Sequence, residues 1–201
     1  MRALKNKKIQ KKEIILRAAL ELFKRYGFKK VSITDIAHEA GVSHVTIFNN
    51  FGSKERLIRD AIKTQIMGML EKYRTIIQGT GSFPEKLKAI VFDKAETSDQ
   101  FQRQLAGSFY QRNLEMKEFI KNLWQNDINQ LTLDLIALGR KEGYIADTLP
   151  KEPIMLYLKI FRDGLLANLE LLGNSGIDSK IFIELNSILL YGLMGKRGKG
   201  T

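Results

Sequence analysis

Residues 32–54 read SITDIAHEAGVSHVTIFNNFGSK, and the helix signals in this stretch decide the fold. Ser32 is a residue type that caps helix N-termini, and Asp35 follows three residues later as a weaker partner for a capping box. Gly41 ends the resulting short helix, and Ser43 caps a second one that runs to about Asn50. The stretch therefore predicts two short helices joined by a tight turn.

Longer helices are expected on both sides of this stretch. Before it, apolar residues recur at helical spacing from about Lys11 to Gly27. They are Ile14, Ile15, Ala18, Ala19, Leu22 and Phe23. After it, a long helix is expected over residues 54–78. The first three helices together make a helix-turn-helix pattern.

The third helix of this pattern has an inner and an outer side. Val42, Ile47 and Phe51 are expected to lock it against the first two helices. The residues left facing out or on the rim are Ser43, His44, Val45, Thr46, Asn49 and Asn50. Asn pairs with adenine, Thr and Val contact a thymine methyl, and His donates to guanine or to a phosphate. A plain surface helix would carry Lys and Glu here, so this face predicts contact with a DNA major groove.

The positive charge of the chain lies in its first third. The 201 residues have a net charge of +11, and residues 1–63 hold 15 Lys and Arg against 6 Asp and Glu. A solvated basic face would explain this, but we favour a polyanion-binding module attached to a nearly neutral body. The arm from Arg2 to Lys12 is either a frayed, solvated helix start or a phosphate-attracting segment that reaches the minor groove.

Three motifs carry a family resemblance: IILRAALELFKRYGF at residues 14–28, SITDIAHEAGVS at residues 32–43 and TIFNNFGSKERLI at residues 46–58. Through them, residues 10–60 resemble the N-terminal domain of the TetR family of bacterial transcriptional regulators. The resemblance implies phosphate contacts from Ser32, Thr34 and Lys54. It implies base or groove contacts from Ser43, His44, Val45, Thr46, Phe48, Asn49 and Asn50.

Three positions depart from the family pattern. Phe48 stands where the family usually has Tyr, so it offers no hydroxyl to a phosphate. Asn50 stands where Tyr or His is frequent, and Val45 replaces a frequent Gly, which adds methyl-bearing surface in the groove. These departures affect the list of contacts and leave the expected fold unchanged.

The rest of the chain also reads as helices. After a linker at residues 79–82, helices are expected over residues 84–97, 100–112 and 116–142, with Gly143 ending the last of them. Pro150 and Pro153 bound the next helix. The fold class is therefore all-α with about nine helices. It combines an N-terminal three-helix DNA-binding domain at residues 1–53 with a larger ligand-binding and dimerisation domain at residues 54–201, in which residues 54–78 form the connecting helix.

Two C-terminal helices are unusually apolar. The first runs from Ile154 to Leu172 and is apolar nearly all round, and the second runs from Ile181 to Met194. Helices of this kind are buried on several sides. A monomer core would account for them, but we favour the intersubunit four-helix bundle of a homodimer.

Aromatic residues are frequent after the linker. The candidates for ligand binding are Phe92, Phe109, Tyr110 and Trp124, with Gln104, Gln111 and Asn122 as further polar contacts. Core packing is the simpler explanation for any single one of them, but together they leave room for an apolar pocket. In the family the C-terminal helices form a cavity for an inducer, and the ligand expected here is small, hydrophobic, and neutral or weakly polar.

The chain lacks the residues that several functional classes require. The chain has no Cys, and its two histidines, His38 and His44, both fall in the helix-turn-helix. Neither a catalytic triad nor a metal site is therefore expected, and no glycine-rich phosphate loop appears. The sequence predicts no enzyme activity and no cofactor. It also predicts a cytoplasmic protein, because it shows neither a membrane span nor a secretory signal.

The expected function is ligand-responsive transcriptional regulation. A homodimer would bind a pseudo-palindromic operator in double-stranded DNA, and an inducer would release it; repression is the usual mode in the family. The alternatives are an activator of the same fold, a non-specific architectural DNA-binding protein, and a helical small-molecule-binding protein or enzyme with an incidental helix-turn-helix. Competition with random DNA at fixed salt separates specific from architectural binding.

Overall fold

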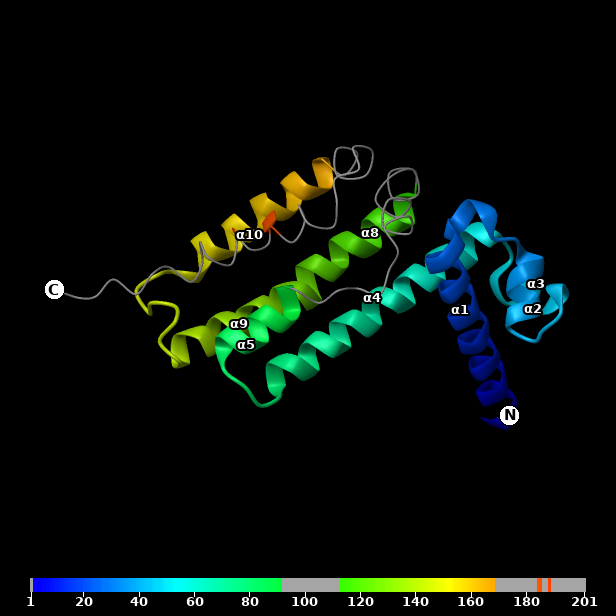
Figure 1. Cartoon of the computed structure of the whole chain (residues 1–201), viewed down its shortest axis with the longest axis horizontal. Coiled ribbons are helices and arrows are strands. Elements are labelled where there is room, and N and C mark those ends of the chain that lie inside the picture. Colours follow the sequence, from blue (N-terminus) through cyan, green and yellow to red (C-terminus); the bar gives the residue numbers. More distant parts are fainter. Residues whose placement is uncertain (1, 92–112, 169–183, 186–187, 189–201) are drawn as a thin grey trace. The chain divides into compact units, whose positions relative to one another are not determined.

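The computed structural model describes residues 2–91, 113–168, 184–185 and 188, and every regular element among them is a helix (Figure 1). The all-α prediction is thereby confirmed. The helix expected at residues 100–112 lies outside the described residues. So does most of the segment from Ile181 to Met194, together with the ends of the helices expected over residues 84–97 and from Ile154 to Leu172.

The first helix, α1 (Arg2–Lys30), is interrupted at the glycine that the sequence marks as its end. Gly27 has φ 77° and ψ 164°, which kinks the helix before its last three residues. The buried face of α1 includes Ile15, Ala19 and Phe23, each fully buried, whereas Ile14 faces solvent. The apolar periodicity therefore located the helix, but it wrongly assigned Ile14 to the buried face.

The described residues form two compact units, and the boundary between the units falls inside α4 (Lys54–Gln78), between Met69 and Leu70. The bounds of α4 match the expected ones. Its start follows from the preceding residues: Gly52 has φ 75°, and the hydroxyl of Ser53 accepts a hydrogen bond of 3.1 Å from the Arg56 N–H. A domain division at residue 53, ahead of a connecting helix, stays a prediction.

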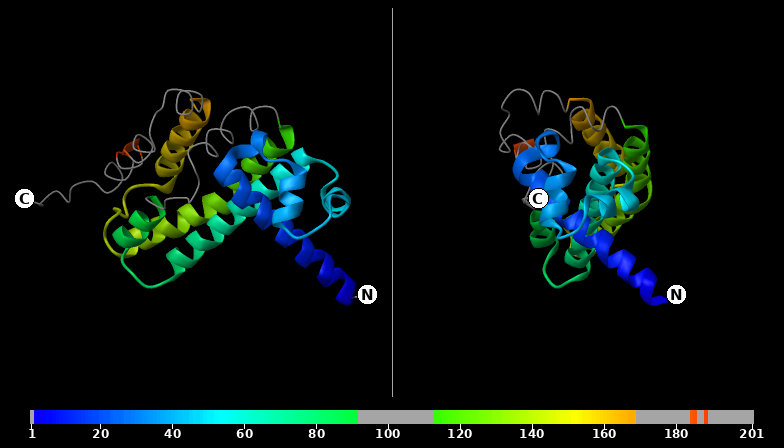
Figure 2. Two further views of the ribbon diagram at one scale, coloured as in Figure 1. Left: turned by 45° about the vertical axis from the view of Figure 1, so that its right-hand side comes forward. Right: turned by 90° about the vertical axis from the view of Figure 1, so that its right-hand side faces the viewer.

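The second unit is built on α9 (Asn129–Lys141), against which both α5 (Phe83–Val91) and α10 (Lys151–Ala167) pack, as Figures 1 and 2 show. Its buried core contains Phe83, Ile136, Ile145 and Ile154. Because Gly139 has no side chain, Ile145 and Phe83 approach its backbone so closely that an added Cβ would lie 2.8 Å from Ile145. Gly143, at φ 73°, ends the helix as expected.

One expected helix is not uniform. Residues 116–142 were predicted as a single segment, but the structure has α8 (Leu114–Leu123), a π-helical turn η2 (Trp124–Ile128) and then α9. A π turn holds more residues than an α turn and rotates the faces that follow it. Along these three elements Ile120, Trp124 and Ile128 are half-buried, and Met116, Leu123, Leu131 and Ile136 are buried.

The helix expected from Ile154 begins three residues earlier, at Lys151, so that Pro153 lies in its first turn, where a missing N–H costs no hydrogen bond. Of its apolar residues, Ile154 is buried, while Leu156, Tyr157 and Ile160 are 57%, 44% and 61% exposed in the single chain. The expectation of burial on several sides therefore does not hold within one chain. No helix in the described part of the chain is both long and apolar enough to cross a membrane.

Candidate DNA-binding site

The second helix, α2 (Ile33–Glu39), begins with a complete capping box. The N–H and the hydroxyl of Ser32 each donate to the Asp35 carboxylate at 2.7 Å, and the Asp35 N–H donates to the Ser32 hydroxyl at 3.1 Å. These bonds lower the pKa of Asp35, with the Ser32 N–H contributing most. The capping box read from the sequence is confirmed, and it holds the Ser32 side chain in place at the surface.

A tight turn joins α2 to α3 (His44–Phe51). Gly41 has φ 63°, a left-handed conformation that favours glycine, and the Val42 N–H donates to the Ala37 carbonyl at 3.0 Å. Ser43 then caps α3, since its hydroxyl accepts from the Thr46 N–H at 3.1 Å. The helix-turn-helix pattern is confirmed.

Buried apolar side chains hold α3 against the rest of the unit. Ile47 and Phe51 are each only 1% exposed, and Ile36 of α2 is fully buried. Val42, expected to join them, is half-buried. The Lys12 ammonium lies 5.4 Å from the centre of the Phe51 ring and 3.1 Å from the Asp60 carboxylate. Lys12, the last residue of the basic arm, therefore contacts residues of its own domain.

The outer face of α3 is a stripe of four exposed residues: His44, Val45, Phe48 and Asn49. Their spacing places them on one side of the helix. Val45 and Phe48 are 64% and 61% exposed, which is unusual for apolar side chains of this size. The structure thus leaves an apolar and amide-bearing surface open to a partner.

Three other candidates take part in hydrogen bonds inside α3. The hydroxyls of Ser43 and Thr46 lie 2.9 Å apart, and the Asn50 amide donates to the Thr46 carbonyl at 2.7 Å. Thr46 and Asn50 are half-buried. Within the predicted outer face, Thr46 is therefore less exposed than Val45 and Asn49, and its hydroxyl lies against that of its cap, Ser43.

The candidates for phosphate contact lie beside this stripe. A small hollow of about 30 Å³ is lined by Ile33, His44, Ile47, Phe48, Ser53 and Lys54. It brings the start of α2, the outer face of α3 and the first residue of α4 together. Thr34 is exposed next to Ile33, and Lys54 is half-buried. The sequence had no signal for this convergence, because the residues come from three separate helices.

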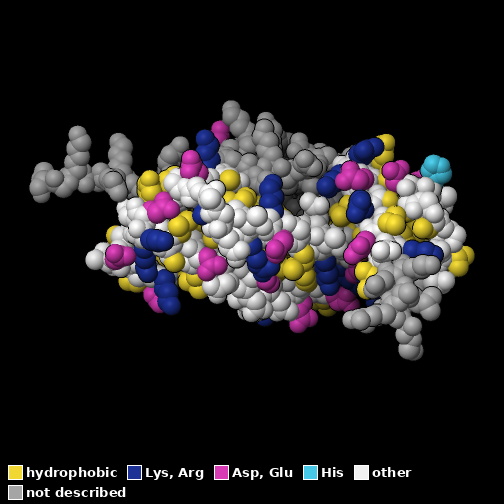
Figure 3. All heavy atoms as spheres, turned by 90° about the horizontal axis from the view of Figure 1, so that it is seen from below, with side chains coloured by type: hydrophobic (Ala, Val, Ile, Leu, Met, Phe, Trp, Pro, Cys, Tyr) yellow, Lys and Arg dark blue, Asp and Glu magenta, His cyan; other side chains and the backbone are white. Residues whose placement is uncertain are grey.

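On the face shown in Figure 3, Lys and Arg side chains are spread over the described surface with acidic side chains between them. In the arm, α1 continues back to Arg2, so residues 2–12 are helical rather than frayed. A minor-groove contact by this arm stays a prediction.

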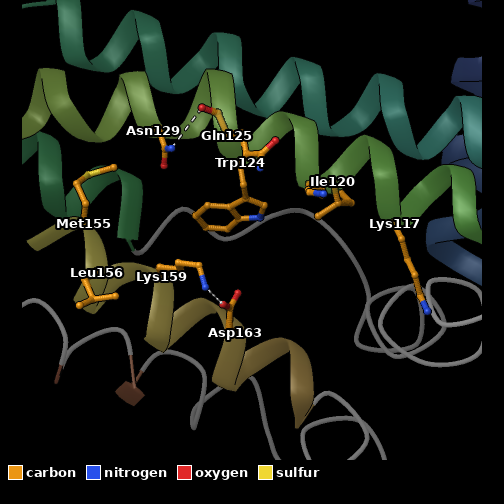
Figure 4. Close-up of a pocket in the computed structure, with 10 residues that line it drawn as sticks. Lys117, Ile120, Trp124, Gln125, Asn129, Met155, Leu156, Lys159 and Asp163 are labelled. Atoms are coloured by element: carbon orange, nitrogen blue, oxygen red, sulfur yellow. Dashed lines mark hydrogen bonds and ion pairs between the residues drawn. The ribbon is translucent and has the colours of Figure 1, made fainter. Parts of the chain in front are cut away.

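A second candidate site is a pocket of about 520 Å³ in the other unit (Figure 4). It is lined by Lys117, Ile120, Lys121, Trp124, Gln125, Asn129, Met155, Leu156, Lys159 and Asp163. Among the predicted ligand-binding residues, Trp124 lies in this lining. Phe92, Phe109 and Tyr110 lie outside the described residues, as do the polar candidates Gln104 and Gln111.

Comparison with known proteins agrees with the geometry of the first unit. Residues 15–61 match the family model for bacterial regulatory proteins of the tetR family. This DNA-binding domain belongs to the TetR family. The chain is accordingly a DNA-binding transcriptional regulator of the helix-turn-helix type, and the resemblance seen in the three motifs is confirmed.

Sequence similarity to other regulators extends beyond the DNA-binding domain. This chain is 24% identical over 170 residues to the HTH-type transcriptional regulator YfiR of Bacillus subtilis, covering 82% of each chain. It is 21% identical over 150 residues to the HTH-type transcriptional repressor KstR2 of Mycobacterium tuberculosis, covering 72% of this chain and 74% of the repressor. The similarity therefore includes much of the second unit.

Solved structures show the same fold at low sequence identity. A transcriptional regulator from Saccharomonospora viridis in complex with choline matches with a TM-score of 0.65 and 21% identity, over 92% of this chain and 98% of that one. The regulator FadR from Bacillus subtilis in complex with stearoyl-CoA matches with a TM-score of 0.55 and 19% identity, over 91% and 97%.

Proposed function

We propose that this chain is a transcriptional repressor that binds a pseudo-palindromic operator as a homodimer and is released by a small hydrophobic ligand. The observation that carries the proposal is the exposed stripe on α3, with Val45, Phe48 and Asn49 beside Lys54. Two such helices, one from each protomer, would enter successive major grooves about one helical turn apart.

The chemistry of the stripe suits base edges. The Asn49 amide can pair with adenine, Val45 and Phe48 can contact thymine methyl groups, and His44 can donate to guanine or to a phosphate. Thr34, Lys54 and the N-terminus of α4 would contact the phosphate backbone. Four further residues already form hydrogen bonds within the domain: Ser32, Ser43, Thr46 and Asn50. They would contact DNA through the donors and acceptors that these bonds do not use.

The homodimer is supported by the exposed apolar residues of α10. Tyr157 and Ile160 would be covered by a second copy of the chain, together with Ile188, which is 66% exposed. These residues fall in the two segments, from Ile154 to Leu172 and from Ile181 to Met194, that the sequence assigns to dimerisation. Two protomers joined through these segments would present two copies of α3 to the DNA, as a pseudo-palindromic operator requires.

Regulation would follow from binding in the second unit. Two TetR-fold regulators have been solved with choline and with stearoyl-CoA, and KstR2 is named a repressor. A ligand that binds one dimer geometry better than the other would shift the population toward it. We propose α4 as the transmitter, since this single helix contains residues of both units. A repressor with this role acts in the cytoplasm, where its operator lies.

The test is selection of operators from random DNA, followed by titration of the selected duplex and a shuffled one at fixed salt. We expect the selected duplex to contain an inverted repeat and to bind at least about a thousandfold more tightly. Asn49→Ala should cost about tenfold in affinity for the selected duplex alone. Asn122→Ala, an exposed residue on α8, is the matched control. Equal affinity for both duplexes would overturn the proposal in favour of architectural binding.

A further inference from the structure

The pocket of the second unit has an apolar side and a basic side. Ile120, Trp124, Met155 and Leu156 contribute apolar surface, and Figure 4 shows the Trp124 ring extending from η2 into the space above α10. Lys117, Lys121 and Lys159 contribute ammonium groups, and Asp163 is the one carboxylate among the described residues of the lining. A volume of about 520 Å³ is within the range of pockets that hold small organic ligands.

The charges of the described lining residues do not balance. The Lys159 ammonium lies 2.7 Å from the Asp163 carboxylate, so these two groups neutralise each other. Lys117 and Lys121 stand one turn apart on α8, and neither forms an ion pair within the described part of the chain. Like charges four residues apart on a helix repel slightly, so an anion placed between them would relieve that repulsion as well as pair with both.

We propose that this pocket binds an amphipathic anion. Its hydrocarbon part would lie against Trp124, Ile120 and Leu156, and its carboxylate or phosphate would pair with Lys117 and Lys121. This inference rests on the proposed function and assigns its ligand a charge, whereas the ligand expected from the sequence was neutral or weakly polar. The change comes from the two lysines, whose place in the lining the sequence did not reveal.

The same lining disfavours an organic cation. Cation sites use carboxylates or a cage of several aromatic rings. Among the described lining residues, the single carboxylate, Asp163, is already paired with Lys159, and Trp124 is the one aromatic ring. A cationic head in this pocket would face two ammonium groups without compensation. A neutral head would leave both lysines as they are and gain nothing from them.

The experiment uses the full chain and three probes that share a ten-carbon tail: decanoate and decyltrimethylammonium below their micelle concentrations, and 1-decanol below its solubility limit. Trp124 is the single tryptophan of the chain, so its fluorescence reports on the pocket directly. We expect saturable binding of decanoate at neutral pH that is at least about tenfold tighter than that of either other probe. The double variant Lys117→Gln/Lys121→Gln should lose about tenfold in decanoate affinity and keep its affinity for 1-decanol.

The matched control is Lys141→Gln/Lys151→Gln, which removes the same charge from exposed positions outside the pocket. It should bind decanoate as the unmodified chain does. Equal binding of the three probes, a preference for the cation, no saturable change at Trp124, or an unaffected double variant would each overturn the inference. Titration of the selected operator with the same samples keeps the two proposals apart: operator binding without decanoate binding refutes only the ligand class.

Discussion

The Arg74 guanidinium on α4 pairs with the Asp127 carboxylate in the π-helical turn that also carries Trp124 into the pocket. Hydrogen bonds to Glu71 and to Asp127 raise the pKa of Arg74, so it stays charged and keeps both partners. π-Helical turns are frequent at functional sites. One ion pair therefore joins the wall of the pocket to the helix that we propose as the transmitter.

Asp127→Asn should uncouple the pocket from DNA binding. We expect decanoate to bind with unchanged affinity, measured by Trp124 fluorescence, but to release the operator less well, with coupling reduced about fivefold. The physical reason is that Arg74 loses its charged partner in η2 and keeps only Glu71. Asp134→Asn on α9, an exposed carboxylate paired with Gln130, is the control. Normal release in the Asp127 variant would show that the signal travels by another route.

Phe48→Tyr should tighten DNA binding. The ring is 61% exposed and lies beside Lys54 around the same hollow, so an added hydroxyl would meet the phosphate backbone there. One further hydrogen bond to a charged group predicts an affinity about tenfold higher. Because phosphate contacts carry no sequence information, the gain should appear on selected and shuffled duplexes alike. Fluorescence anisotropy measures both, and unchanged or weaker affinity would mean that α3 docks in another orientation.

The capping box of α2 should make stability depend on pH. The pKa of Asp35 is lowered in the folded chain from its ordinary value of 3.8, so its contribution is present above pH 3.8 and is lost as the pH falls through the lower folded value. Asp35→Ala should therefore lower Tm at neutral pH, and its difference from the unmodified chain should vanish in acid. Circular dichroism melts across the acid range measure this. A difference that persists at the lowest pH would assign the effect to packing.

Ile160→Asp should dissociate the proposed homodimer. Ile160 is 61% exposed on α10 in the single chain, and a carboxylate placed in an apolar interface cannot be compensated. We expect a shift to monomer in sedimentation velocity, together with operator affinity reduced at least about a hundredfold. Ile14→Asp, at a residue 48% exposed on α1, is the control for a surface substitution. A dimer that survives the change would place the interface elsewhere.

The sequence by itself determined the helices and the DNA-binding motif, because the signals involved are local. Caps at Ser32 and Ser43, stops at Gly41 and Gly52, and apolar periodicity each act within a few residues, so α2, α3 and the bounds of α4 could be predicted closely. The inward positions of Ile47 and Phe51 followed from the same spacing.

The tertiary structure alone decided which side chains come together. Thr46 turned out to bond to Ser43, so that the exposed stripe runs through Val45, Phe48 and Asn49. The π turn at residues 124–128 interrupted a helix predicted to be continuous, and Lys117 and Lys121 came to line the same pocket as Met155 and Leu156. The contacts in the pocket join residues far apart in the chain. They depend on how the helices pack, which local spacing does not encode.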